Sequence, residues 1–98
     1  MSHISASVIL LTYNQEAFVA EALQSLLDQD YPNLEIVVSD DASADNTWNI
    51  VSTLAQNYVG PKKIVLNRNS HNAGIGANYA KAFLLTSGSV IFSAAGDD

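Results

Sequence analysis

The residues of this sequence that are best suited to bind a ligand or metal ion are two pairs of adjacent aspartates, Asp40-Asp41 and Asp97-Asp98. Paired carboxylates suit a hard cation such as Mg²⁺ or Mn²⁺, which a diphosphate can share. A carboxylate can also accept hydrogen bonds from hydroxyl groups or from a ring N–H. Two simpler interpretations stay open: an Asx turn with helix capping for the first pair, and a solvated acidic chain end for the second.

Four short apolar runs lead into polar segments of this kind, and their spacing predicts a repeating plan. The runs expected to form strands are residues 7–12, 34–39, 63–67 and 90–94. The first two are nearly all apolar, which is typical of strands covered on both faces of a parallel sheet. Successive runs begin about 28 residues apart, which leaves room for one strand and one crossover helix.

The segments between these runs have helical periodicity. The helices expected from it cover residues 16–29, 44–58 and 76–86. Asn14 is a candidate N-cap for the first helix, Ser43 or Asp45 could cap the second, and Trp48 is expected in the core. The order βαβαβαβ predicts an α/β fold with an open, mainly parallel, Rossmann-like sheet. Right-handed crossovers with one reversal give the strand order 3-2-1-4.

One edge of this predicted sheet carries the chemistry. In open parallel sheets, ligands bind beyond the carboxyl ends of the strands. Each predicted strand passes there from an apolar interior into polar or acidic residues, whereas the opposite edge carries ordinary turns. Tyr13 could stack on a base or be a half-buried tyrosine at a strand end. We therefore expect one binding cleft lined by Thr12, Tyr13, Asn14, Asp40, Asp41 and Asp97.

The composition excludes several classes of function. A net charge of −6 over 98 residues argues against a nucleic-acid partner, which would need a basic patch. The absence of cysteine excludes disulfides, a thiolate metal site and a thiol nucleophile. Neither GxGxxG after the first strand nor GxxxxGKS/T occurs, so the two best-known phosphate-binding loops are missing. Because no signal peptide or apolar run of membrane-spanning length is present, we predict a cytoplasmic location without a membrane span in this segment.

Several motifs together resemble family-2 glycosyltransferases with the GT-A fold. They are SVILLTYN at residues 7–14, YPNLEIVVSDDASADNT at residues 31–47, NAG at residues 72–74 and GDD at residues 96–98. The resemblance covers nearly the whole chain, in order and at matching spacing. It implies that residues 1–98 are the nucleotide-sugar-binding half of a glycosyltransferase domain, truncated at its C-terminus. The parent enzyme would be an inverting transferase that moves a sugar from a nucleoside diphosphate to an acceptor hydroxyl.

The resemblance also implies roles for single residues. Thr12, Tyr13 and Asp41 would contact the nucleotide base, with Asp41 accepting a hydrogen bond from a ring N–H. Asp97 matches the last aspartate of the family's Asp-x-Asp motif, which touches the ribose and holds a metal on the diphosphate. With Asp98 beside it, we expect a site for Mg²⁺ or Mn²⁺.

Two positions depart from the family pattern. Ala95 stands in place of the first aspartate of the Asp-x-Asp motif, so the metal and ribose contacts rest on fewer carboxylates. Ala42 stands where the family often has glycine. The catalytic base would lie beyond Asp98, so we expect the fragment to bind the diphosphate part of a donor and to be inactive alone.

Two other functions stay open at this point. A sugar-phosphate nucleotidyltransferase would normally show a glycine-rich, basic loop after the first strand, where this chain has residues 13–16, Tyr-Asn-Gln-Glu. A non-catalytic, receiver-like signalling module needs an aspartate at the end of its third strand, where this chain has Asn67-Arg68-Asn69. Val90, Ile91 and Phe92 are expected to form an edge strand with no following element, which predicts a possible homodimer through this edge or a neighbouring face.

Overall fold

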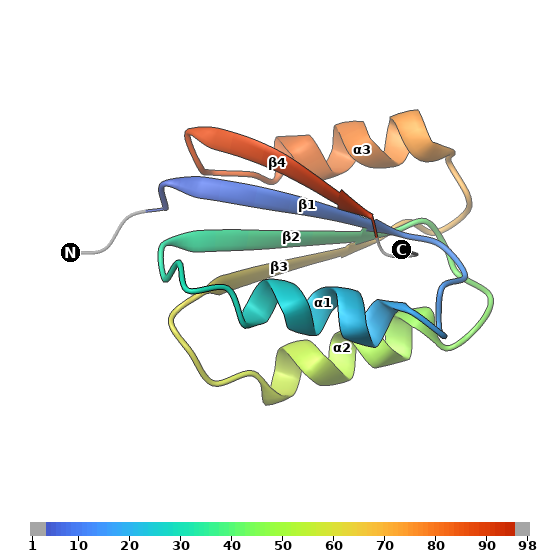
Figure 1. The fold of residues 1–98 in the computed structure, drawn as a ribbon. Coiled ribbons are helices and arrows are strands. Elements are labelled where there is room, and N and C mark those ends of the chain that lie inside the picture. Colours follow the sequence, from blue (N-terminus) through green and yellow to red (C-terminus); the bar gives the residue numbers. More distant parts are fainter. Residues whose placement is uncertain (1–3, 96–98) are drawn as a thin grey trace.

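The computed structural model describes residues 4–95, which form one parallel sheet with helices on both faces (Figure 1). The strands are β1 (Ala6–Thr12), β2 (Leu34–Asp40), β3 (Lys63–Arg68) and β4 (Val90–Ala95). The helices are α1 (Val19–Leu27), α2 (Thr47–Asn57) and α3 (Ile75–Leu84). Every predicted element is present, and the order β3-β2-β1-β4 confirms the predicted topology. All three strand pairs are parallel.

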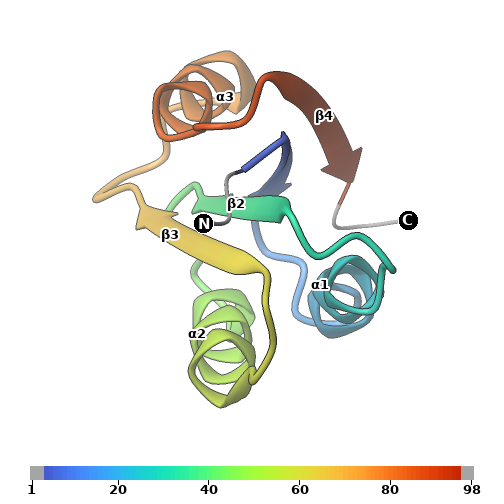
Figure 2. The same ribbon diagram turned by 90° about the vertical axis from the view of Figure 1, so that its left-hand side faces the viewer.

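The two central strands are buried on both faces because helices cover both. Figure 2 shows α1 and α2 on one side of the sheet and α3 on the other. Side chains of successive strand residues point to opposite faces, so Val8 and Leu10 pack toward α1 and α2. Ile9 packs on the other face with Val37 and Ala82 of α3. This two-sided burial explains why these runs are almost continuously apolar.

Two details differ from the sequence-based expectations. The first helix starts at Val19 with Phe18 as its N-cap, and no side chain caps it, so the prediction of Asn14 as an N-cap is wrong. The reason is that Gln15 and Phe18 close a separate turn before the helix, with the amide of Phe18 donating to the carbonyl of Gln15 at 2.9 Å. The second helix starts at Thr47 with Asn46 as its N-cap and no side-chain cap, so the prediction of Ser43 or Asp45 as its cap is wrong. Asp45 lies one residue before the N-cap, where its carboxylate accepts the amide of Thr47 at 2.9 Å.

The amino edge of the sheet is held by a buried carboxylate, Glu35 of β2. Its Oε1 accepts hydrogen bonds from the Ser7 hydroxyl at 2.7 Å and from the Ser87 amide at 2.9 Å. Its Oε2 accepts the Ser87 hydroxyl at 2.9 Å and pairs with Lys63 Nζ at 3.7 Å. Burial alone would raise the pKa of Glu35, but these contacts outweigh it and lower the pKa below its ordinary value. Glu35 therefore ties β1, β3 and the connection before β4 together as an ionised group.

The connection from α3 to β4 passes very close to the start of β1. A Cβ atom on Gly88 would lie 2.5 Å from the carbonyl carbon of Ala6 and 2.7 Å from the Ser7 nitrogen, so only glycine fits there. The Gly88 amide donates to the Ser7 hydroxyl at 2.9 Å. Because Ser7 also contacts Glu35, this close approach fixes where β4 begins beside β1.

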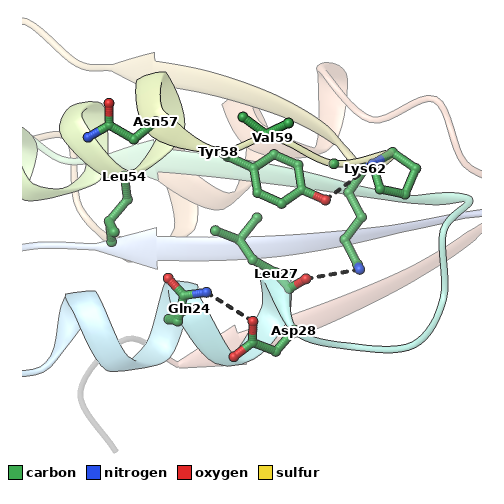
Figure 3. Close-up of a pocket in the computed structure, with 10 residues that line it drawn as sticks. Gln24, Leu27, Asp28, Leu54, Asn57, Tyr58, Val59 and Lys62 are labelled. Carbon is green, nitrogen blue, oxygen red and sulfur yellow. Dashed lines mark hydrogen bonds between the residues drawn. The ribbon is translucent and has the colours of Figure 1, made fainter.

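A second polar contact, at the same edge of the sheet, joins the end of α1 to the segment that follows α2 (Figure 3). The Lys62 Nζ atom is nearly buried and donates to the carbonyl of Leu27 at 3.0 Å, which satisfies a free carbonyl at the end of α1. A cavity of about 470 Å³ lies beside it, with Gln24, Asp28 and Tyr58 in its wall. None of the helices in residues 4–95 has the length and apolarity to cross a membrane.

Candidate functional site

A pocket of about 500 Å³ opens at the carboxyl edge of the sheet, where ligands were expected. The residues around it come from the ends of β1 and β2, the segment leading into α3, and β4. They are Leu11, Thr12, Tyr13, Gln15, Asp41, Asn72, Gly74, Ile75, Asn78 and Ala94. Three of the six predicted cleft residues, Thr12, Tyr13 and Asp41, are thus brought together in one pocket. Asn14 and Asp40, though described, do not line it.

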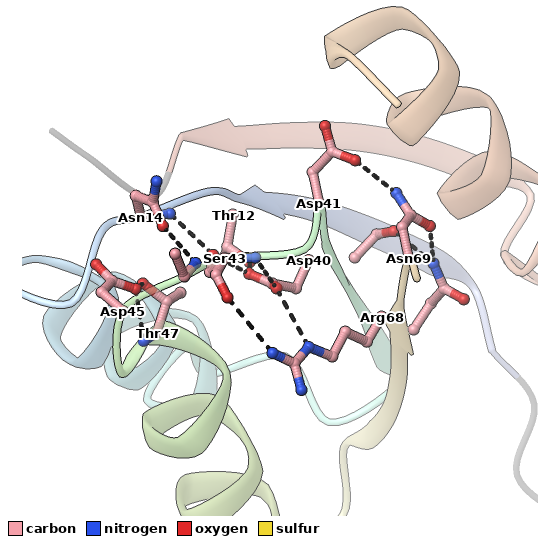
Figure 4. Close-up of polar contacts among 12 residues, drawn as sticks. Thr12, Asn14, Asp40, Asp41, Ser43, Asp45, Thr47, Arg68 and Asn69 are labelled. Carbon is pink, nitrogen blue, oxygen red and sulfur yellow. Dashed lines mark hydrogen bonds and ion pairs between the residues drawn. The ribbon is translucent and has the colours of Figure 1, made fainter. Parts of the chain in front are cut away.

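Asp41 contributes a carboxylate to this pocket, and three donors hold it in place. Its Oδ1 accepts hydrogen bonds from Asn69 Nδ2 at 2.9 Å (Figure 4) and from the Ala73 amide at 2.7 Å. Its Oδ2 accepts the Gly74 amide at 2.9 Å. Burial would raise the pKa of Asp41, but these hydrogen bonds and the charge of Lys81 outweigh it and lower the pKa below its ordinary value. The carboxylate is therefore ionised at neutral pH.

The lone pairs of Asp41 leave room for a ligand. An ionised carboxylate has about four acceptor positions. The three donors above occupy two on Oδ1 and one on Oδ2. One acceptor position on Oδ2 therefore stays available to a donor group in the pocket.

Asp40, the neighbouring carboxylate, is turned into the protein. It is fully buried and accepts the Thr12 hydroxyl at 2.7 Å, the Ser43 amide at 2.9 Å and the Ser43 hydroxyl at 2.6 Å. Arg68 Nε lies 3.9 Å from its Oδ2 (Figure 4). This arrangement matches the local, turn-forming interpretation of Asp40. Its contact with Thr12 orients a residue that does line the pocket.

Asn14 joins the two loops that follow β1 and β2. Its backbone has a positive φ of 50°, which asparagine tolerates better than most residues. Its amide donates to the Ser43 hydroxyl at 2.8 Å, and its Oδ1 accepts the Ala44 amide at 2.8 Å. Ala42, in the loop after β2, also has a positive φ, 62°, a conformation that glycine adopts at a lower energetic cost. The contacts fix the loop that carries Tyr13.

A buried network of amide side chains lies behind Asp41, and the sequence did not single it out. Asn78 Oδ1 accepts Asn69 Nδ2 at 3.0 Å and the Ser39 hydroxyl at 2.6 Å. Asn78 Nδ2 donates to the Ser39 carbonyl at 3.0 Å. The network therefore links the ends of β2 and β3 to α3 and orients Asn69 toward Asp41. The available signal was the position of Asn69, directly after a strand at the binding edge.

Arg68 and Trp48 contact each other at the outer side of these loops. The Arg68 guanidinium lies 5.6 Å from the centre of the Trp48 ring, and its Nη2 donates to the Ser43 carbonyl at 3.4 Å. Trp48 is half-buried, so the expectation of a core tryptophan is wrong. The cause is that its ring covers Arg68 rather than packing between α2 and the sheet. Arg68 acts here as a partner of Asp40 and Trp48.

The predicted metal residues Asp97 and Asp98 lie outside the described residues. Within residues 4–95, no group of three or more histidine and acidic side chains is placed to hold a metal ion. Thr12, Tyr13 and Asp41, which do line the pocket, are the residues expected to contact the nucleotide base.

Comparison with known proteins decides the family. Residues 7–98 match the model of glycosyl transferase family 2. The chain belongs to this family. It is 34% identical over 94 residues to the abequosyltransferase RfbV of Salmonella typhimurium, covering 94% of this chain and 28% of RfbV.

Solved glycosyltransferase structures are similar to this chain over nearly its whole length. The structure of Staphylococcus aureus TarS 1–349 in complex with UDP-GlcNAc has a TM-score of 0.85 at 32% identity, covering 96% of this chain and 27% of that TarS chain. The mannosyltransferase PcManGT of Pyrobaculum calidifontis, in complex with GDP-Man and Mn²⁺, has a TM-score of 0.89 at 27% identity. That match covers 99% of this chain and 28% of PcManGT.

These matches confirm the resemblance to family-2 glycosyltransferases and the GT-A fold. They do not favour the nucleotidyltransferase or the receiver-like module. The chain spans just over a quarter of the length of RfbV, of PcManGT and of the TarS 1–349 chain.

Proposed function

We propose that this chain supplies the donor-nucleotide site of an inverting glycosyltransferase that uses a nucleoside-diphosphate sugar. The observation that carries the proposal is the pocket at the carboxyl edge, where an ionised carboxylate with one free acceptor position, Asp41, lies beside the exposed aromatic ring of Tyr13. Family membership supports it, and so do the nucleotide sugars in the TarS and PcManGT structures.

The free acceptor position of Asp41 favours a base with a ring N–H. Uracil and guanine carry such a donor, whereas cytosine and adenine present a ring nitrogen acceptor at the equivalent position. A lone pair facing a carboxylate would leave both acceptors desolvated and unpaired, which costs about 1–3 kcal/mol. The nucleotide sugars of the two neighbouring structures, UDP-GlcNAc and GDP-Man, both contain a base of the first kind. We infer a UDP- or GDP-linked donor.

We further propose that Asp97 and Asp98 hold Mg²⁺ or Mn²⁺ against the diphosphate. The net charge of −6 would oppose binding of an anion, and a divalent cation would offset the phosphate charge. The Mn²⁺ in the PcManGT complex supports a divalent metal in this fold. We also propose a cytoplasmic location for this chain.

The experiment is a calorimetric titration of the purified chain with UDP, GDP, CDP and ADP in the presence of Mn²⁺. UDP or GDP is expected to bind about 30-fold more tightly than CDP or ADP, the factor that a 2 kcal/mol mismatch produces. Equal binding of all four, or no binding of UDP and GDP, would contradict the proposed base recognition. Replacing Mn²⁺ with EDTA should weaken the binding of UDP. The binding of uridine, which has no phosphates, should stay unchanged.

In the reaction that we propose for the whole enzyme, a general base removes the proton of an acceptor hydroxyl. The hydroxyl oxygen bonds to the anomeric carbon from the face opposite the nucleotide, and the bond to the diphosphate oxygen breaks. The nucleoside diphosphate leaves with the bonding electrons. The described residues would bind and orient the donor, and we assign the base to none of them.

We also propose that isolated chains associate through β4. This edge strand contains no charged residue, and its Phe92 is 53% exposed, whereas the other edge strand carries Lys63 and Arg68. Sedimentation at low micromolar concentration is expected to show a dimer that Phe92→Lys dissociates. A single 10.5 kDa species for the unaltered chain would contradict this proposal.

A further inference from the structure

Ile75, the first residue of α3, is unusual among the apolar residues around the pocket. Its side chain is 82% exposed, yet it lines the pocket with Leu11, Tyr13 and Ala94. An exposed isoleucine alone needs no explanation. Its position does, because it directly follows the two amides, of Ala73 and Gly74, that Asp41 binds.

The backbone before Ile75 is fixed in one conformation. Gly74 has φ 92°, which glycine adopts readily and other residues rarely do. The Gly74 amide is held by Asp41, and the Gly74 carbonyl accepts the Asn78 amide at 2.9 Å. Ile75 is therefore presented to the pocket without a loop having to order on binding, which lowers the entropic cost of a contact.

Tyr13 and Ile75 line the pocket from two segments that lie far apart in the sequence. The segment containing Tyr13 runs from β1 toward α1, which covers one face, and Ile75 begins α3, which covers the other (Figure 2). Tyr13 is 47% exposed, so both apolar side chains are open to a ligand. Asp41, at the end of β2, contributes the hydrogen-bond acceptor of the same pocket.

We propose that Ile75 is a base-binding residue, which covers one face of the nucleobase while Tyr13 stacks on the other and Asp41 accepts the ring N–H. This inference rests on the proposed donor-nucleotide site and adds to it the residue that completes the base pocket. The attraction comes from burial of apolar surface, so Ile75 contacts any base whose edge can also bind Asp41. Asp41 determines which base fits, and Ile75 determines how tightly it is held.

The test compares Ile75→Ala with Leu84→Ala, a matched control on the same helix whose side chain is 81% exposed outside this pocket. Ile75→Ala is expected to weaken UDP and GDP binding about tenfold, which corresponds to about 1.4 kcal/mol, and Leu84→Ala to leave it unchanged. Ile75→Phe should restore or exceed the original affinity, since aromatic side chains stack on bases. Thermal unfolding of all three variants checks that the fold is retained.

Three results would overturn the inference. One is binding of UDP and GDP by Ile75→Ala within twofold of the unaltered chain. Another is an equal loss in Leu84→Ala. The third is an equal loss for ribose 5-phosphate in competition, because that ligand has no base. If the unaltered chain binds neither UDP nor GDP, the proposed function itself fails and the inference fails with it. If the unaltered chain binds them and one of the three results above is found, only the inference about Ile75 fails.

Discussion

Replacing Asp41 with asparagine is expected to weaken UDP binding about 100-fold and to reduce the preference for UDP over CDP. The variant amide keeps one oxygen, which can still accept from Asn69 and Ala73. Its NH₂ group would then face the Gly74 amide and the pocket, where it donates instead of accepting. A donor repels the N–H of uracil and suits the ring nitrogen of cytosine. Calorimetric titration with UDP and CDP measures both effects.

The same change is expected to lower the free energy of unfolding by about 2 kcal/mol, because the Gly74 amide loses its charged acceptor. Asp30→Asn is the matched control, since it removes one negative charge from an exposed position in the turn between α1 and β2. The control should change neither binding nor stability by a measurable amount. An Asp41→Asn variant that keeps its UDP affinity within threefold would contradict the assigned role of Asp41.

Glu35→Gln is expected to give the largest loss of stability, about 3 kcal/mol at pH 7. The carboxylate accepts two hydroxyl donors, one amide and a lysine charge in a fully buried position, and glutamine cannot accept all of them. A domain of this size has only about 5–10 kcal/mol to lose. Urea denaturation monitored by far-ultraviolet circular dichroism measures the difference.

The loss of stability caused by Glu35→Gln should become smaller as the pH falls. The pKa of Glu35 in the folded chain is lowered from its ordinary value of 4.5, so the stability from its charge is fully present above about pH 4.5. It is lost as the pH falls through the folded pKa. The difference between the unaltered chain and Glu35→Gln should therefore shrink in acid. Glu21→Gln, at an exposed position on α1, is the control, and a difference independent of pH between 7 and 3 would contradict this account.

The fold could be predicted from the sequence because each strand has a strong local signal. The runs before Thr12 and Asp40 are apolar on both faces, and turn residues separate them at regular intervals. Strand order followed from the handedness of crossovers, a rule with few exceptions. Helix starts were harder to place. The turn at Gln15 to Phe18 carries helix-forming residues but closes before the helix, and nothing local distinguishes the two.

The site could be predicted only in part, because its geometry depends on partners far along the chain. Asp40 and Asp41 are adjacent and chemically identical, yet one turns inward to Ser43 and the other toward Asn69. Successive residues at a strand end point to opposite sides, but the sequence does not show which side holds the donors. The role of Glu35 was missed for the same reason, since its main partner, Ser87, is distant in sequence.

The position of β1 inside the sheet has a consequence for the order of folding. β1 is synthesised before the other strands, but Ala6 pairs with Val90 and Leu11 with Ala95, so one of its edges stays open until β4 has been synthesised. Pairing between such distant segments carries a large loop-closure cost and slows folding. β1, β2 and β3 can assemble during translation. The apolar edge of β1 that later pairs with β4 then stays unpaired. That edge exposes the nascent chain to aggregation until β4 docks, and docking of β4 is expected to be the late step.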